Sequence, residues 1–99
     1  MSMTDTPVDA TRAEDLTIVN RRGLHARASA KLVRLVEGFD AQVSVTRDGQ
    51  TVGGTSIMGL MMLAASPGCC IRVSASGPEA DAALAAIRDL VESGFGETD

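Results

Sequence analysis

The chain contains one histidine, His25, within the short run Gly-Leu-His-Ala-Arg at residues 23–27. The residues before this run alternate as a strand does, and those after it have the apolar spacing of a helix. His25 is therefore expected at a helix N-terminus, where unpaired backbone N–H groups and the helix dipole favour an anion. Imidazole attacks phosphorus near neutral pH and later releases it. The run predicts a phosphoryl-binding site, with Arg27 beside it to neutralise charge.

Length and composition limit what kind of protein this is. Ninety-nine residues predict one domain with one core. The net charge of −4 and the presence of only two aromatic residues, both phenylalanine, argue against nucleic-acid binding. No apolar run approaches the roughly 20 residues that a membrane-spanning helix needs, and the polar start is unlike a signal peptide. These features predict a cytoplasmic protein.

The two cysteines are expected to be structural. Cys69 and Cys70 are adjacent, and neighbours in a strand point to opposite faces, so they are expected to be reduced thiols, at least one of them in the core. A metal site is not expected, because one histidine and two distant cysteines lack any ligand spacing. No cofactor is predicted.

The apolar pattern divides the chain into a leader and one folded region. Residues 1–13 are expected to be a flexible leader, and residues 14–97 a single domain. Turn residues separate the predicted elements: Asp48-Gly49 is typical of a tight hairpin, and Gly38 is expected to end the first helix. Strands are predicted at residues 15–20, 41–47, 50–52 and 70–75, and helices at 26–37, 55–64 and from Pro78 to about 92.

This order, strand-helix-strand-strand-helix-strand-helix, predicts an α/β two-layer sandwich. The hairpin makes the sheet antiparallel, so four strands are expected with three helices on one face. The helix at residues 55–64 is apolar nearly all round and is expected to be buried, with Thr55 or Ser56 as its N-cap. Phe95 is expected to fold back onto the core.

These motifs together resemble HPr, the histidine-containing phosphocarrier family of the bacterial phosphoenolpyruvate-dependent phosphotransferase system. The resemblance rests on the run at residues 23–27, on Ser-Ile-Met-Gly-Leu-Met at residues 56–61, and on the final helix. It covers roughly residues 14–97, including the order of elements. One departure is that the family usually has proline where this chain has Ala28. Alanine favours helix, so the first turn is still expected to form, less rigidly.

The resemblance implies a carrier that is not an enzyme in its own right. His25 would accept a phosphoryl group through Nδ1 from enzyme I and pass it to an enzyme IIA-type protein. Arg27 would orient the phosphoryl oxygens. Ser56 matches the position that an HPr serine kinase modifies in part of the family, although a serine there is also a simple helix cap. Residues expected to shape the anion site at the helix start are Gly23, Leu24, Ala26 and Ala28.

Partner proteins are expected to dock around His25. Met58 and Leu60 are predicted to form an adaptable apolar patch, and Arg34 to add positive charge. The protein is expected to be a monomer. Three functions remain open: a carrier for sugar uptake, a regulatory nitrogen-type branch that acts through its phosphorylation state, and an interaction module that has lost phosphotransfer.

Overall fold

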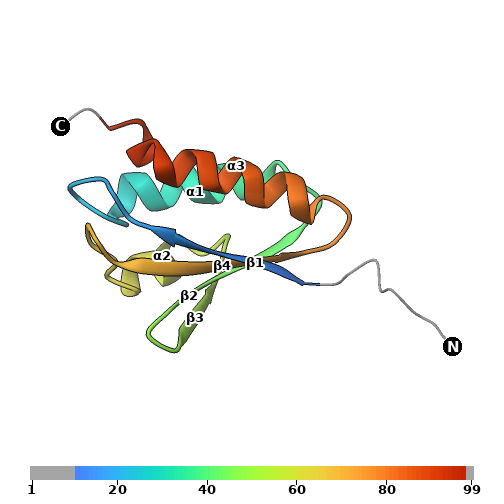
Figure 1. Ribbon diagram of the computed structural model, residues 1–99, viewed down its shortest axis with the longest axis horizontal. Coiled ribbons are helices and arrows are strands. Elements are labelled where there is room, and N and C mark those ends of the chain that lie inside the picture. Colours follow the sequence, from blue (N-terminus) through green and yellow to red (C-terminus); the bar gives the residue numbers. More distant parts are fainter. Residues whose placement is uncertain (1–10, 98–99) are drawn as a thin grey trace, which may run out of the picture.

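The computed structural model describes residues 11–97, which form an open sheet with helices packed on it (Figure 1). The strands are β1 (Arg12–Thr17), β2 (Gln42–Arg47), β3 (Gln50–Gly53) and β4 (Cys70–Ser76). Their order across the sheet is β1-β4-β2-β3, and every neighbouring pair is antiparallel. The predicted four-stranded antiparallel sheet is confirmed.

The hairpin between β2 and β3 has the predicted turn. Arg47 pairs with Gln50, which leaves Asp48 and Gly49 as a two-residue loop. Both loop residues have positive φ, 52° and 78° respectively, as this class of hairpin turn requires. The Asp-Gly pair therefore sets the register of the strands that follow.

The helices are α1 (Ala26–Glu37), α2 (Ile57–Met62) and α3 (Ala80–Glu92), followed by a short 3-10 turn, η1 (Gly94–Gly96). Helices α1 and α3 run side by side along one face of the sheet (Figure 1). Helix α2 packs against α1 and the edge strand β3. The bounds of α1 and its end at Gly38 match the prediction.

The core lies between the sheet and helices α1 and α3. Alternate strand residues, such as Val45, Ile71 and Val73, are fully buried against it. From the helices come Leu32 and Ile87, and Phe95 closes the end of the layer with none of its surface exposed. The predicted return of Phe95 to the core is confirmed.

Strand β1 begins earlier than predicted, at Arg12 rather than Asp15. Arg12 and Ala13 pair with β4 opposite Ala75 and Ser74, so they belong to the sheet and not to a leader. The Arg12 side chain also forms an ion pair with Asp81 of α3. The sequence did not predict these two residues as strand because they lack a clear apolar alternation. Backbone hydrogen bonds alone pair them with β4. The rest of the predicted leader, residues 1–10, lies outside the described residues.

The prediction of a buried helix at residues 55–64 is wrong in two respects. Helix α2 is shorter, Ile57–Met62, and only Leu60 within it is buried. Met58 and Met62 are 71% and 66% exposed. Apolar composition without amphipathic spacing does not reveal which face of a helix packs, and one turn and a half of helix covers little of the core.

The cysteines are less buried than predicted. Both are free thiols: Cys70 is exposed, and Cys69, just before β4, is half-buried and packs against the core without being fully buried in it. The buried face of α1 runs through Ala28, Leu32 and Val36, which leaves Ala26 exposed at the helix start. Within residues 11–97 there is no helix of the length and apolarity that crossing a membrane demands.

Candidate functional site

The loop before α1 is locked in place by a close backbone contact. Gly23 has a φ of +63°, and a Cβ atom there would lie 2.1 Å from the carbonyl oxygen of Ala65. That carbonyl accepts a hydrogen bond of 3.0 Å from the N–H of Leu24, whose side chain is buried. Only glycine fits this conformation and this approach. These contacts of Gly23 and Leu24 with Ala65 fix the backbone of the loop just before His25.

His25 is the N-cap of α1, as its position predicts. Its backbone is extended, with φ −73° and ψ 180°, and its carbonyl accepts the Ser29 N–H at 2.9 Å. The imidazole Nδ1 accepts a hydrogen bond from the Arg27 N–H at 3.3 Å. This bond is long, so the Nδ1 lone pair is directed at the helix start but only loosely held there.

The first turn of α1 offers further donors. The N–H groups of Ala26 and Ala28 make no hydrogen bond to any other residue in the described range. Helix N-termini with free N–H groups attract anions. The Arg27 side chain is exposed and donates to no residue within 11–97. Ala28 is fully buried and its turn is intact, so the helix begins without the proline usual at this position.

A carboxylate that the sequence reading missed touches the histidine. The Oε2 atom of Glu97 lies 2.5 Å from Nε2 of His25, and the two side chains are only 11% and 22% exposed. This hydrogen bond from His25 is the main cause that lowers the pKa of Glu97, and a second one, from Asn20, adds to it. The only sequence signal was the return of Phe95 to the core, which brings the residues after it to this end of the molecule.

Ser56 and the predicted docking residues lie on and around α2. Ser56 is exposed and caps this helix, accepting the Gly59 N–H at 3.0 Å. Met58 and, on α1, Arg34 are exposed and available to partners. Leu60 is wrong as a docking residue, because it is fully buried and anchors α2 to the core. No hydrogen bond within the described range joins Ser56 to His25.

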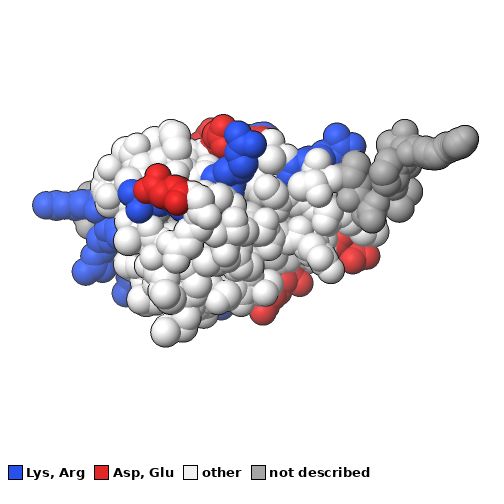
Figure 2. All heavy atoms as spheres, turned by 90° about the horizontal axis from the view of Figure 1, so that it is seen from below, with Lys and Arg blue, Asp and Glu red and all other residues white. Residues whose placement is uncertain are grey.

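Charge is unevenly spread over the surface. Figure 2 shows Lys and Arg side chains gathered at the left end, where Figure 1 places the loop between β1 and α1. Arg21, Arg22 and Arg27 are the exposed cations of this loop and helix start. A broad uncharged area lies next to them in the same view. An anionic group approaching His25 therefore meets positive charge.

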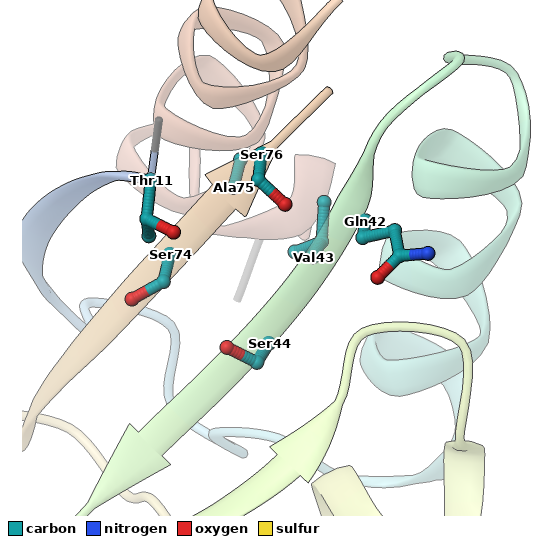
Figure 3. A pocket seen from close by; sticks show the side chains of 7 residues that line it. All are labelled: Thr11, Gln42, Val43, Ser44, Ser74, Ala75 and Ser76. Atoms are coloured by element: carbon teal, nitrogen blue, oxygen red, sulfur yellow. The ribbon is translucent and has the colours of Figure 1, made fainter. Parts of the chain in front are cut away.

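The polar hollow drawn in Figure 3 offers no competing chemistry. It lies on β2 and β4, and its lining consists of hydroxyl, amide and aliphatic side chains without a titratable group. Within residues 11–97 there is also no group of three or more side chains arranged to hold a metal ion. The loop and helix start around His25 are thus the place where nucleophile, free N–H groups and cations come together.

Comparison with known proteins identifies the family. The model of the family described as "PTS HPr component phosphorylation site" matches residues 13–93. The HPr phosphocarrier of Cupriavidus necator is 47% identical over 83 residues, 84% of this chain and 93% of that protein. The NPr phosphocarrier of Escherichia coli K12 is 41% identical over 85 residues, 85% of this chain and 94% of that protein.

Solved structures show the same fold. HPr from Thermoanaerobacter tengcongensis superposes with a TM-score of 0.84 at 39% identity, covering 89% of this chain and 99% of that one. HPr from Bacillus anthracis gives 0.80 at 34% identity, with 84% and 99% covered. With its fold, its single histidine at a helix start and these relatives, the chain belongs to the HPr family of phosphocarrier proteins of the phosphotransferase system.

Proposed function

We propose that His25 carries the phosphoryl group, accepting it at Nδ1 from phosphorylated enzyme I and passing it to an enzyme IIA-type acceptor. The observation that supports this most directly is the position of Nδ1 at the start of α1, beside the free N–H groups of Ala26 and Ala28. Imidazole supplies the nucleophile, and the helix start with Arg27 supplies positive charge for the phosphoryl oxygens.

The modest construction of this site suits a carrier. Transfer in both directions requires that the phosphoryl group is held firmly enough to survive and loosely enough to leave. One exposed guanidinium and a few N–H groups at an exposed helix end meet this need, whereas a deep cage of cations would retain the group. The partner proteins would supply most of the catalysis, docking on the basic loop and on exposed α2 residues such as Met58.

Incubation with phosphoenolpyruvate and enzyme I tests the proposal. One phosphoryl group is expected on wild-type protein, labile to acid and stable to alkali, as a phosphoramidate is. His25→Ala is expected to accept none while its circular dichroism spectrum stays that of the wild type. Phosphorylation of His25→Ala, or an acid-stable product, would rule out His25 as the carrier residue.

A nitrogen-type regulatory role is the second candidate, favoured by the 41% identity to the Escherichia coli NPr. The chemistry at His25 would be the same, and only the acceptor would differ. The test is to offer purified phosphorylated protein to a sugar-type and a nitrogen-type enzyme IIA and to compare the transfer rates. Faster transfer to the sugar-type acceptor would reject the nitrogen-type role.

A further inference from the structure

We propose that Glu97 is a positioning residue for His25: its carboxylate holds the proton on Nε2, so that Nδ1 carries the lone pair that attacks phosphorus. This rests on the proposed function of His25 and adds a residue to its site. The contact joins residues that lie 72 positions apart in the sequence. The hydrogen-bond partners of the two ring nitrogens fix where the ring proton lies.

Both ring nitrogens have partners that allow only one neutral form of the imidazole. Nδ1 faces the backbone N–H of Arg27, which can only donate. Nε2 faces the Oε2 atom of Glu97, an acceptor when the carboxyl is ionised. The neutral ring must therefore carry its proton on Nε2. A carboxylate that holds one imidazole nitrogen in this way selects the tautomer and orients the ring.

The carboxylate of Glu97 is itself held by a buried amide. The Nδ2 group of Asn20 donates to Oε1 of Glu97 at 3.1 Å and to the carbonyl oxygen of Gly23 at 2.9 Å. Both partners are acceptors, so the amide nitrogen of Asn20 must face them. Its Oδ1 atom is buried and finds no partner within residues 11–97. Leaving this buried oxygen unpaired costs free energy of folding. In return, the amide is oriented so that its N–H donates to Glu97.

The turn after α3 delivers Glu97 to this place. Gly94, Phe95 and Gly96 all have positive φ, between 58° and 72°. Phe95 is fully buried, and its carbonyl oxygen accepts a 2.6 Å hydrogen bond from Nζ of Lys31 on α1. A non-glycine residue in this conformation is strained and persists only where its surroundings hold it. The turn therefore sets the position of Glu97 against α1 rather than leaving it to a free chain end.

This arrangement has a direct consequence for the transfer step. The Nδ1 lone pair of His25 forms the new N–P bond while the bond between phosphorus and the donor group breaks, and the donor keeps that electron pair. The Nε2 proton stays where it is, so the ring becomes a cation. Glu97 faces that cation and stabilises it, and the reverse step restores the neutral ring as the phosphoryl group leaves.

Replacement of Glu97 by glutamine separates positioning from simple contact. Asn20 still presents its N–H to this side chain, so the new amide oxygen faces Asn20 and the new NH2 faces Nε2 of His25. Nε2 must then accept, and the ring proton moves to Nδ1, where it blocks the nucleophile. The long bond from Arg27 opposes this shift only weakly. Replacement by alanine merely frees the ring. Glu97→Gln is therefore expected to be the more harmful change.

The experiment measures the imidazole tautomer and the transfer rate on the same proteins. Because His25 is the only histidine, one pair of imidazole ¹⁵N signals reports its state in alkaline solution. Wild type is expected to show Nε2–H, and Glu97→Gln is expected to shift toward Nδ1–H. Phosphorylation by enzyme I should slow about tenfold in Glu97→Ala and about a hundredfold in Glu97→Gln. Glu92→Gln removes an exposed carboxylate at the end of α3 and serves as the matched control, expected to behave as wild type.

Two results would overturn the inference. One is an Nδ1–H signal in the wild type. The other is a Glu97→Gln protein that keeps Nε2–H and transfers no more slowly than Glu97→Ala. Failure of the proposed function looks different: wild type would then accept no phosphoryl group, while its ¹⁵N spectrum would still report whether Glu97 holds the Nε2 proton.

Discussion

Two helices of this protein begin with a side-chain cap, and the two caps are built differently. At α1 the cap is His25, held on its far side by Glu97 and surrounded by backbone contacts from the loop. At α2 the cap is Ser56, which accepts one N–H and is otherwise open to solvent. The same local cap thus occurs once with a side chain that is held on two sides and once with a side chain that is accessible to solvent.

The surroundings of the two caps differ in the same sense. Around His25 lie the cations of the loop and helix start, which suit an anionic phosphoryl group. Beyond Ser56, α2 exposes apolar side chains, among them Ile57, Met58 and Met62. Exposed methionines make an adaptable surface for several partners. The comparison is consistent with our proposal that group transfer takes place at the start of α1 and that partner proteins bind at α2.

Among the variants that leave His25 in place, Arg27→Ala is expected to have the largest effect, because it removes the side-chain cation at the first cap. Arg27 is exposed and bonds to no described residue, so the free energy of unfolding should change by less than about 0.5 kcal/mol. The rate of transfer from enzyme I should fall by on the order of ten- to a thousandfold, because the guanidinium stabilises the phosphoryl charge in the transition state. Stopped-flow or quenched-flow phosphorylation measures this rate.

Arg12→Ala is the matched control for Arg27→Ala. It removes one exposed cation from the first residue of β1, where the side chain pairs with Asp81 and not with any group of the His25 site. Its transfer rate should equal that of the wild type. Equal rates in wild type and Arg27→Ala would show that the guanidinium has no part in transfer.

A smaller effect is expected from Ser56→Asp at the second cap. Aspartate is a good N-cap, so the melting temperature should stay near that of the wild type. The added charge would lie on the proposed docking surface, and capture of phosphoryl groups from enzyme I should slow about threefold to tenfold at low salt. The deficit should shrink as salt screens the charge. Unchanged capture by Ser56→Asp at low salt would leave Ser56 as a cap without a regulatory role.

Gln50→Glu makes the same change of charge at a distant place and controls for it. Gln50 is exposed at the hairpin between β2 and β3. Its glutamate variant should accept phosphoryl groups at the wild-type rate at every salt concentration. A kinase-modified sample of the wild type gives the stricter form of the test, because a phosphoryl group adds roughly −1.5 to −2 charges.

The smallest expected effect is on stability as a function of pH. The hydrogen bond from His25 lowers the pKa of Glu97 in the folded protein. The unfolded chain therefore binds the Glu97 proton at a higher pH than the folded protein does. The stabilising contribution is full above the ordinary carboxyl pKa and is lost as the pH falls through the folded value. Urea unfolding of wild type and Glu97→Ala should show a stability difference that begins to narrow near the ordinary carboxyl pKa of 4.5 and shrinks further as the pH falls below it.

Glu92→Ala is the control for these unfolding measurements, because it also removes one negative charge but lies outside the His25 site. If the difference between wild type and Glu97→Ala stays constant, or widens, as the solution becomes acidic, the ionised Glu97 does not stabilise the fold through His25.

The sequence predicted the fold well wherever local pattern and packing agree. The bounds of α1, the Asp48-Gly49 turn and the buried Phe95 all follow from residues close in the chain. It failed at α2, where an apolar run hides which side packs, so that Leu60 was assigned to a partner surface and is in the core. The start of β1 was missed because backbone pairing leaves little trace in side-chain pattern.

The site was predicted in part for the same reason. His25 and Arg27 share one short run, and their places at the helix start follow from it. Glu97 was missed because its contact with His25 depends on three consecutive residues of positive φ after α3 and on the orientation of the Asn20 amide. The spacing of residues in the sequence predicts neither the positive φ values nor the orientation of the amide. A contact between residues 72 positions apart forms only when the helices have packed on the sheet.

The close contact between Gly23 and the Ala65 carbonyl also limits how this site can change in evolution. Its neighbours can change by small steps, but any other residue at position 23 brings a Cβ atom into the Ala65 carbonyl and strains the backbone at once. No single codon change there leads to a protein with an undisturbed His25. A position that contributes no side chain to the chemistry is thus among the least free to evolve.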